Sequence, residues 1–208
     1  MYNTRIKYAM DNFIDENYFL PMKDNYELKE IAESGKSLLV LNVEGTNICV
    51  EEYDNKKRCE FVRGAKKQGM KKCIDHFVLK YNGSDWDLHM IEMKSSVGDK
   101  NWNDIKAKMR SSYLNIKAMC EFLGIHVDKV YTYTTYEKIC FSTPENSADL
   151  MALYPLFGEK ATNSKQDEWD QGIINIKIDE IIKWPHKAIK MERDAVSGLQ
   201  GRLNIFSE

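Results

Sequence analysis

The sequence predicts an α/β protein with a central mixed sheet flanked by helices. Two apolar segments, residues 73–81 and 87–95, flank the turn-forming stretch NGSD at residues 82–85 and indicate a β-hairpin. A helical pattern follows at residues 103–123, and another strand pattern follows at residues 127–135. Strands combined with a long helix in this way are typical of a sheet that is covered by helices.

The elements before the hairpin are assigned from caps and turns. Residues 25–34 are expected to form a short helix, which Asp24 or Asn25 can cap and Gly35 can end. Residues 38–43 and 47–53 then read as a pair of strands around a Glu-Gly-Thr turn. With the hairpin, the long helix and the strand after it, the expected order of the core is α-β-β-β-α-β.

The long helix at residues 103–123 carries apolar residues at helical spacing. Asn101 or Asn103 can cap its start, and Gly124 suits the position just after its end. Towards the C-terminus we expect a helix near residues 147–157 and a polar loop at 158–171. A strand at 173–178 and a C-terminal helical region complete the chain.

Composition limits the class of protein. The chain has 208 residues, of which 43% are hydrophobic and 30% charged, with a net charge of −2. These values exclude disordered, collagen-like and coiled-coil classes. We expect a single domain over residues 1–208, with a core at about 25–135 and a C-terminal extension at about 142–208.

The sequence also indicates a cytoplasmic protein. No apolar run reaches the roughly 18–20 residues of a membrane span, so no membrane partner is expected. The first twelve residues lack the apolar region of a signal peptide. The five cysteines are widely spaced without a CxxC pair, which is typical of reduced intracellular thiols.

The hairpin brings charged residues together at its open end. A turn centred on Gly83 and Ser84 pairs Asp75 with Glu92, and Lys94 follows on the same face as Glu92. Directly opposed like charges destabilise a sheet, and a divalent cation between the two carboxylates would reverse that effect. Mg²⁺ characteristically takes one or two protein carboxylates. The pattern therefore predicts a Mg²⁺ site at this edge.

These residues resemble those of the PD-(D/E)xK nuclease superfamily, whose fold is restriction-endonuclease-like. In that superfamily an Asp begins one strand and a Glu-x-Lys tripeptide ends the next, as Asp75 and Glu92-Met93-Lys94 do here. The similarity covers residues 26–135, including the α-β-β-β-α-β order and the long helix after the Glu-x-Lys strand.

The resemblance implies a Mg²⁺-dependent endonuclease or exonuclease, for which Mn²⁺ can substitute. Such an enzyme hydrolyses phosphodiester bonds of DNA or RNA through water activated by the metal. The resemblance implies that Asp75, Glu92 and Lys94 are the catalytic residues. It also implies that Asp75, Glu92 and the main-chain carbonyl of Met93 bind the metal. An acidic residue from the preceding helix often joins such a site, and the candidates are Glu30, Glu33 and Glu44.

The chain also departs from the superfamily pattern. Ile74 stands where a proline is often found, and no glutamine is evident on the following helix. A second Glu-x-Lys tripeptide occurs at residues 27–29, so the tripeptide alone is a weak signal. The ordinary alternative is a solvent-exposed hairpin end that carries unrelated charges.

Two basic regions favour a polyanionic partner. Residues 56–72 carry a net charge of +7, which leaves −9 for the rest of the chain. The helix at 103–123 carries a second stripe of basic and aromatic residues, which alone reads as a solvated face. The candidate nucleic-acid-binding residues are Arg63, Lys66, Lys67, Lys71, Lys72, Lys106, Arg110, Tyr113 and Lys117.

The sequence therefore favours a nuclease, with DNA favoured over RNA as the substrate. The alternatives are an inactive nucleic-acid-binding or assembly subunit with a nuclease-like fold, and a module whose basic segment docks an acidic protein. Because a double-strand cut needs two active sites, a homodimer or a subunit of a larger complex is expected.

Overall fold

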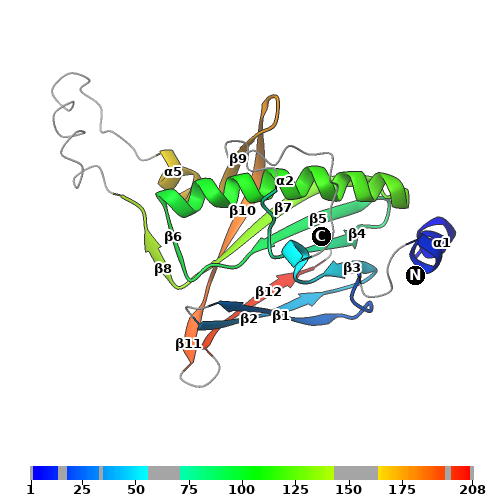
Figure 1. Ribbon diagram of the computed structural model, residues 1–208, viewed down its shortest axis with the longest axis horizontal. Coiled ribbons are helices and arrows are strands. Elements are labelled where there is room, and N and C mark those ends of the chain that lie inside the picture. Colours follow the sequence, from blue (N-terminus) through cyan, green and yellow to red (C-terminus); the bar gives the residue numbers. More distant parts are fainter. Residues whose placement is uncertain are drawn as a thin grey trace.

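A long helix and two larger sheets form three layers in the described part of the chain, which also contains a small two-stranded sheet (Figure 1). The computed structural model describes residues 2–13, 18–32, 35–55, 71–142, 164–194 and 198–206. Helix α2 (Asp99–Leu123) covers one face of a six-stranded mixed sheet, and a four-stranded sheet covers the opposite face. Each interface between layers has its own cluster of buried apolar side chains. The expected α/β class with a central mixed sheet is confirmed, but a second sheet, and not a helix, covers the face opposite α2.

The six-stranded sheet carries the predicted hairpin at its centre. Strand β4 runs antiparallel to both of its neighbours, whereas β5, β7 and β10 are parallel to one another. The strand order is β3 (Asn47–Val50), β4 (His76–Tyr81), β5 (Trp86–Glu92), β7 (Val127–Tyr136), β10 (Ile181–Lys190) and β9 (Ile173–Lys177).

The register of the β4–β5 hairpin is the predicted one. His76 pairs with Ile91 and Phe77 with Met90, around the expected turn. Phe77 and Met90 belong to the core that packs under α2. Because side chains two residues apart on a strand share a face, Asp75 lies on the same face as Phe77, and Glu92 on the same face as Met90. Both carboxylates therefore face α2.

The four-stranded sheet was not predicted, and the helix expected at residues 25–34 is wrong. Tyr26 and Leu28 are buried and alternate with exposed neighbours, which is the two-residue period of a strand. The sheet consists of β1 (Asn25–Ala32), β2 (Gly35–Val43), β12 (Gly198–Ile205) and β11 (Glu192–Asp194).

The two strands expected around the Glu-Gly-Thr turn lie in different sheets. Strand β2 pairs with β1 and β12, whereas β3 pairs with β4. The chain therefore crosses from one sheet to the other at this turn.

The C-terminal region contributes strands to both sheets. The strand expected at 173–178 is β9, but the helical region expected after it is wrong, because β10 pairs with β7 and β12 pairs with β2. The helix expected at 147–157 lies outside the described residues. Within the loop expected at 158–171, residues 164–170 form helix α5 (Ser164–Asp170).

Helix α2 begins four residues before its predicted start. Gly98 is its N-cap and makes no side-chain capping bond, so the expected caps Asn101 and Asn103 lie inside the helix. Gly124 follows its end with φ 68°, as predicted for the left-handed position that favours glycine.

None of the described helices is long and apolar enough to cross a membrane. The remaining elements are α1 (Thr4–Phe13), the 3₁₀ turn η1 (Tyr53–Asn55), β6 (Ser96–Gly98) and β8 (Lys138–Cys140).

Candidate active site

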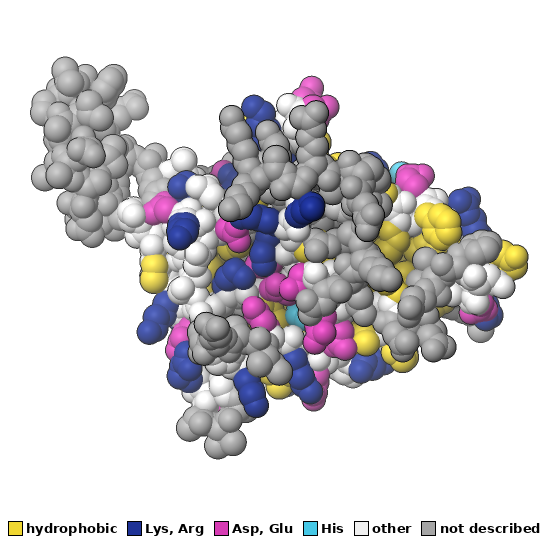
Figure 2. Space-filling view, in the orientation of Figure 1, with side chains coloured by type: hydrophobic (Ala, Val, Ile, Leu, Met, Phe, Trp, Pro, Cys, Tyr) yellow, Lys and Arg dark blue, Asp and Glu magenta, His cyan; other side chains and the backbone are white. Residues whose placement is uncertain are grey.

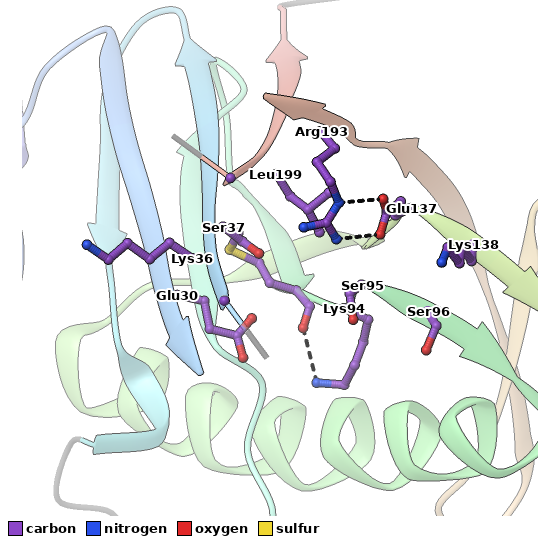
Figure 3. Close-up of a pocket in the computed structure, with 13 residues that line it drawn as sticks. Glu30, Lys36, Ser37, Lys94, Ser95, Ser96, Glu137, Lys138, Arg193 and Leu199 are labelled. Carbon is purple, nitrogen blue, oxygen red and sulfur yellow. Dashed lines mark hydrogen bonds and ion pairs between the residues drawn. The ribbon is translucent and has the colours of Figure 1, made fainter. Parts of the chain in front are cut away.

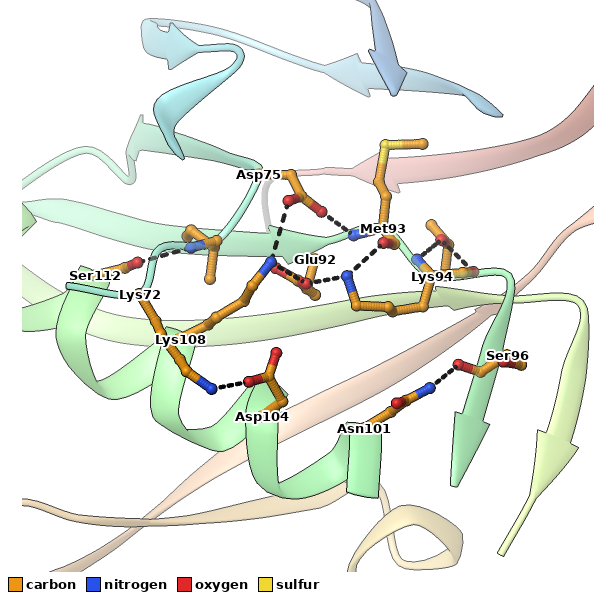
Figure 4. Close-up of polar contacts among 12 residues, drawn as sticks. Lys72, Asp75, Glu92, Met93, Lys94, Ser96, Asn101, Asp104, Lys108 and Ser112 are labelled. Atoms are coloured by element: carbon orange, nitrogen blue, oxygen red, sulfur yellow. Dashed lines mark hydrogen bonds and ion pairs between the residues drawn. The ribbon is translucent and has the colours of Figure 1, made fainter. Parts of the chain in front are cut away.

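Asp75 is held in place from three sides. Its main-chain carbonyl accepts a hydrogen bond from Tyr53 N at 2.8 Å. The neighbouring Ile74 N donates to Ser112 Oγ on α2 at 3.0 Å. The Asp75 side chain is buried, and its Oδ2 accepts from Met93 N at 2.6 Å (Figure 4). The carboxylate is thereby tied to the residue that follows β5.

Glu92, the last residue of β5, is fully buried. Its Oε1 accepts a hydrogen bond from Lys108 Nζ at 2.6 Å and forms an ion pair with Lys94 Nζ. Its Oε2 has no hydrogen-bond partner within the described part of the chain. A buried carboxylate oxygen without a partner is costly, so this atom is a ready acceptor for a ligand.

Lys94 is anchored by its backbone. Its N–H donates to Thr135 Oγ1 on β7 at 2.9 Å, and the same hydroxyl donates to the Lys94 carbonyl at 3.1 Å. Its ammonium group donates to the Met93 carbonyl at 3.1 Å. The Lys94 side chain remains 23% exposed, so the ammonium lies at the solvent edge of the site.

Lys108 completes the cluster, and the sequence analysis missed it. It comes from α2, and its Nζ lies 2.6 Å from Glu92 Oε1 and 3.5 Å from Asp75 Oδ1. Figure 4 shows this ammonium between the two carboxylates. Lys108 lies three residues after Ile105 and four residues before Ser112, which are both buried. This helical spacing puts Lys108 on the same side of α2 as those residues, and it could have been noticed in the sequence.

Burial and neighbouring charges change the ionisation of these groups. Burial, together with the nearby Asp75 carboxylate, raises the pKa of Glu92 to about 7, against the opposing effect of Lys94 and Lys108. Burial alone would lower the pKa of Lys108, but the attraction of Glu92 and Asp75 outweighs it and raises that pKa. Glu92 is therefore poised to change charge near neutral pH.

The three candidates for an additional acidic residue differ in position. Glu30 lies on β1 rather than on a helix, and burial followed by the Asp75 charge raises its pKa. Glu33 lies outside the described residues. Glu44 is exposed and lies just beyond the end of β2. Glu30 pairs with Ser37 on β2, and at about 3.3 Å per residue Glu44 lies roughly 23 Å further along that strand. Only Glu30 of the described pair is near the cluster.

The oxygen donors of the cluster suit the expected Mg²⁺. Asp75, Glu92 and the Met93 carbonyl offer the hard oxygen ligands that Mg²⁺ prefers, and Glu92 Oε2 lacks a partner among the described residues. Across the same part of the chain, no group of three or more His, Cys, Asp and Glu side chains is arranged to hold a metal ion. The fit to Mg²⁺ therefore rests on two carboxylates and one main-chain carbonyl, with the positive charge of Lys108 between the carboxylates.

A cavity of about 520 Å³ opens beside Lys94, between the ends of the two sheets (Figure 3). Arg193 donates to both carboxylate oxygens of Glu137 there, at 2.8 and 2.7 Å. Lys36 and Lys138 are exposed. We call it the Lys94 cavity, and its charged lining residues are Glu30, Lys36, Lys94, Glu137, Lys138 and Arg193.

Basic residues outnumber acidic ones in this lining by four to two. On the face drawn in Figure 2, Lys and Arg side chains lie beside acidic ones near the middle of the molecule. A positively charged rim around a buried acidic cluster suits a ligand with negative charges.

The predicted basic stripe of α2 faces elsewhere. Lys106 Nζ lies 2.9 Å from both carboxylate oxygens of Glu168 on α5. Arg110 donates to the Lys177 carbonyl on β9 at 3.3 Å. Lys106 and Lys108 are two residues apart and so project roughly 200° apart around the helix. Lys106 and Arg110 of the stripe therefore contact α5 and β9 and not Asp75 and Glu92.

The other candidate nucleic-acid contacts are dispersed. The Tyr113 ring packs 4.8 Å from that of Trp184, and Lys117 Nζ lies 5.8 Å from the centre of the Tyr113 ring. Lys72 forms an ion pair with Asp104 on α2. Lys71 is exposed. Arg63, Lys66 and Lys67 lie outside the described residues.

Comparisons with protein-family models, with curated proteins and with solved structures each found no match. Asp75, Glu92 and Lys94 therefore carry the functional inference without support from a relative.

Proposed function

We propose that this protein is a metal-dependent nuclease of the PD-(D/E)xK type. One observation carries the proposal: Asp75, Glu92 and Lys94 meet where β4 begins and β5 ends, at one end of two central strands of the sheet. Asp75 Oδ2 is bonded to the residue between Glu92 and Lys94, and the Lys94 ammonium pairs with Glu92. The predicted hairpin register accounts for this meeting.

The order of elements around the site also supports the proposal. The helix expected at residues 25–34 is a strand, but α1, β3, β4, β5, α2 and β7 give the α-β-β-β-α-β order of the resembled fold if α1 takes its place and the short strand β6 is left out. The β1–β2 hairpin is then an insertion between α1 and β3. We propose that the central sheet and α2 form a restriction-endonuclease-like core to which the four-stranded sheet is added.

Each residue has a defined part in the proposed reaction. Asp75, Glu92 and the Met93 carbonyl would hold Mg²⁺. When bound, Mg²⁺ supplies Lewis acidity to a phosphoryl group and lowers the pKa of water. The partly exposed Lys94 ammonium can stabilise the negative charge that develops on the phosphate. The burial of Glu92 keeps bulk water away from the carboxylates.

The Lys94 cavity is the proposed route of the nucleic acid. Lys94 lines it, and Lys36 and Lys138 add positive charge to the same lining. Cationic side chains along a groove neutralise successive phosphates. The α2 stripe contributes less to this route than expected, because Lys106 and Arg110 are engaged by α5 and β9.

The proposal is tested by replacing Lys94. Cleavage of single-stranded DNA, double-stranded DNA and RNA is measured with Mg²⁺ or Mn²⁺ for the wild type, Lys94→Ala and the exposed control Lys100→Ala. We expect Lys94→Ala to lose cleavage while its melting temperature and nucleic-acid affinity stay close to those of the wild type. Unchanged cleavage by this variant would refute the assignment.

Lys108 favours a second candidate function. Its ammonium already balances Asp75 and Glu92, as a metal ion otherwise would. We propose as the alternative a nucleic-acid-binding subunit that keeps the fold without catalysis. Such a subunit would bind DNA or RNA with strong salt dependence and would take up no Mn²⁺ at Asp75 and Glu92.

A further inference from the structure

The ammonium of Lys108 lies between the carboxylates of Asp75 and Glu92, the two side chains that would hold the proposed metal ion. It contacts Glu92 Oε1 at 2.6 Å and Asp75 Oδ1 at 3.5 Å. Its side chain is only 19% exposed, and the Glu92 side chain is not exposed at all. The proposed reaction assigns this lysine no role.

Charge balance makes this position informative. When both are ionised, the carboxylates of Asp75 and Glu92 face the two ammonium groups of Lys94 and Lys108, so these four charges sum to zero. Glu30 adds a further carboxyl group nearby. A divalent cation would bring two more positive charges into this largely buried space, and withdrawal of one ammonium group would offset part of that excess.

Lys108 is the ammonium that would withdraw. Lys94 contacts only Glu92 of the two carboxylates and has a second acceptor in the Met93 carbonyl, at the solvent edge. Lys108 contacts both carboxylates, which Lys94 does not. Asp104 lies one helical turn earlier on α2, is 36% exposed and already pairs with Lys72, so a withdrawn Lys108 would share this carboxylate with Lys72.

We propose that Lys108 is a resident cation that holds the two carboxylates together until a divalent metal ion displaces it. This inference rests on the proposed metal site. Lys108 is thus a positioning residue, which stabilises the metal-free protein and lowers its affinity for the metal. Both effects come from the same two contacts.

Direct measurement of Mn²⁺ binding tests the inference without relying on cleavage. Calorimetry and the electron paramagnetic resonance of free Mn²⁺ give the affinity of the metal-free full chain in the absence of nucleic acid. Lys108→Gln removes the charge, and Lys108→Arg retains it. Lys106→Gln is the matched control, because Lys106 is also ion-paired on α2 but to Glu168. Glu92→Gln identifies the site.

We expect Lys108→Gln to bind Mn²⁺ at least about fivefold more tightly than the wild type, the lower end of ordinary coupling between sites. Lys108→Arg and Lys106→Gln should bind no more tightly than the wild type. Equal or weaker binding by Lys108→Gln, while Glu92→Gln abolishes binding, overturns the role of Lys108 and leaves the proposed metal site intact. No binding by any variant overturns both.

A second measurement uses the wild type alone and does not depend on the folding of a variant. Amine acetylation, followed by mass spectrometry, reports how accessible each lysine is. We expect Mn²⁺ to increase the acetylation rate of Lys108 and to leave that of Lys106 unchanged. A Lys108 rate that stays constant up to saturating Mn²⁺ contradicts displacement.

Discussion

The main-chain N–H of Met93 donates to Asp75 Oδ2 at 2.6 Å and ties the segment before β4 to the residue after β5. Asp75 is thus a structural acceptor as well as a candidate metal ligand. A buried N–H that loses its acceptor costs about 1–3 kcal/mol. The two roles of Asp75 can therefore be separated by choosing the replacement.

We expect Asp75→Asn and Asp75→Ala to lose Mn²⁺ binding alike but to differ in stability. The asparagine amide oxygen can still accept from Met93 N, whereas alanine cannot. Asp75→Ala should therefore be less stable than Asp75→Asn by about 1–3 kcal/mol in urea denaturation. Equal stability of the two variants would show that the bond to Met93 contributes nothing to folding.

The ionisation of Glu92 should make stability fall as the pH rises towards neutrality. The folded protein holds this proton up to a pKa of about 7, whereas the ordinary value is 4.5. The stabilisation is present below pH 4.5 and is lost as the pH rises from 4.5 to about 7, by about 3 kcal/mol in all. Urea denaturation of the metal-free protein across this range measures the loss.

Glu92→Gln should flatten the same part of the stability curve, because the side chain no longer titrates. The matched control is Glu27→Gln, whose carboxylate is 65% exposed on β1. Saturating Mn²⁺ should also restore stability above pH 7, because the metal stabilises the ionised form. A wild-type curve with the same slope as that of Glu92→Gln would exclude Glu92 as the group responsible.

The parts of the fold that were predicted correctly depend on local patterns. The turn at residues 82–85 determined the β4–β5 register, and apolar spacing with Gly124 determined the end of α2. The four-stranded sheet depends on distant partners instead. Strand β2 pairs with β12, about 160 residues later in the chain, and no local pattern reveals that pairing.

The candidate site divides in the same way. Asp75, Glu92 and Lys94 follow from the register of two adjacent strands, which is readable from the turn. Lys108 and Lys106 depend on how α2 is rotated about its axis, which is determined by its packing on the sheet and on α5. The charge pattern of the helix does not show which of these lysines faces the carboxylates.

Removing the positive charges at the entrance of the Lys94 cavity should weaken nucleic-acid binding in a salt-dependent way. For each phosphate that the protein no longer neutralises, the slope of log affinity against log salt becomes shallower by roughly 0.7–0.9. If Lys36 and Lys138 each neutralise one phosphate, the double variant Lys36→Gln/Lys138→Gln should have a slope that is shallower by roughly 1.4–1.8. Lys29→Gln is the matched control, because Lys29 is exposed on β1 and does not line the cavity. Fluorescence anisotropy at a series of salt concentrations gives the slopes. A double variant with the wild-type slope would mean that the nucleic acid approaches Asp75 and Glu92 by another route.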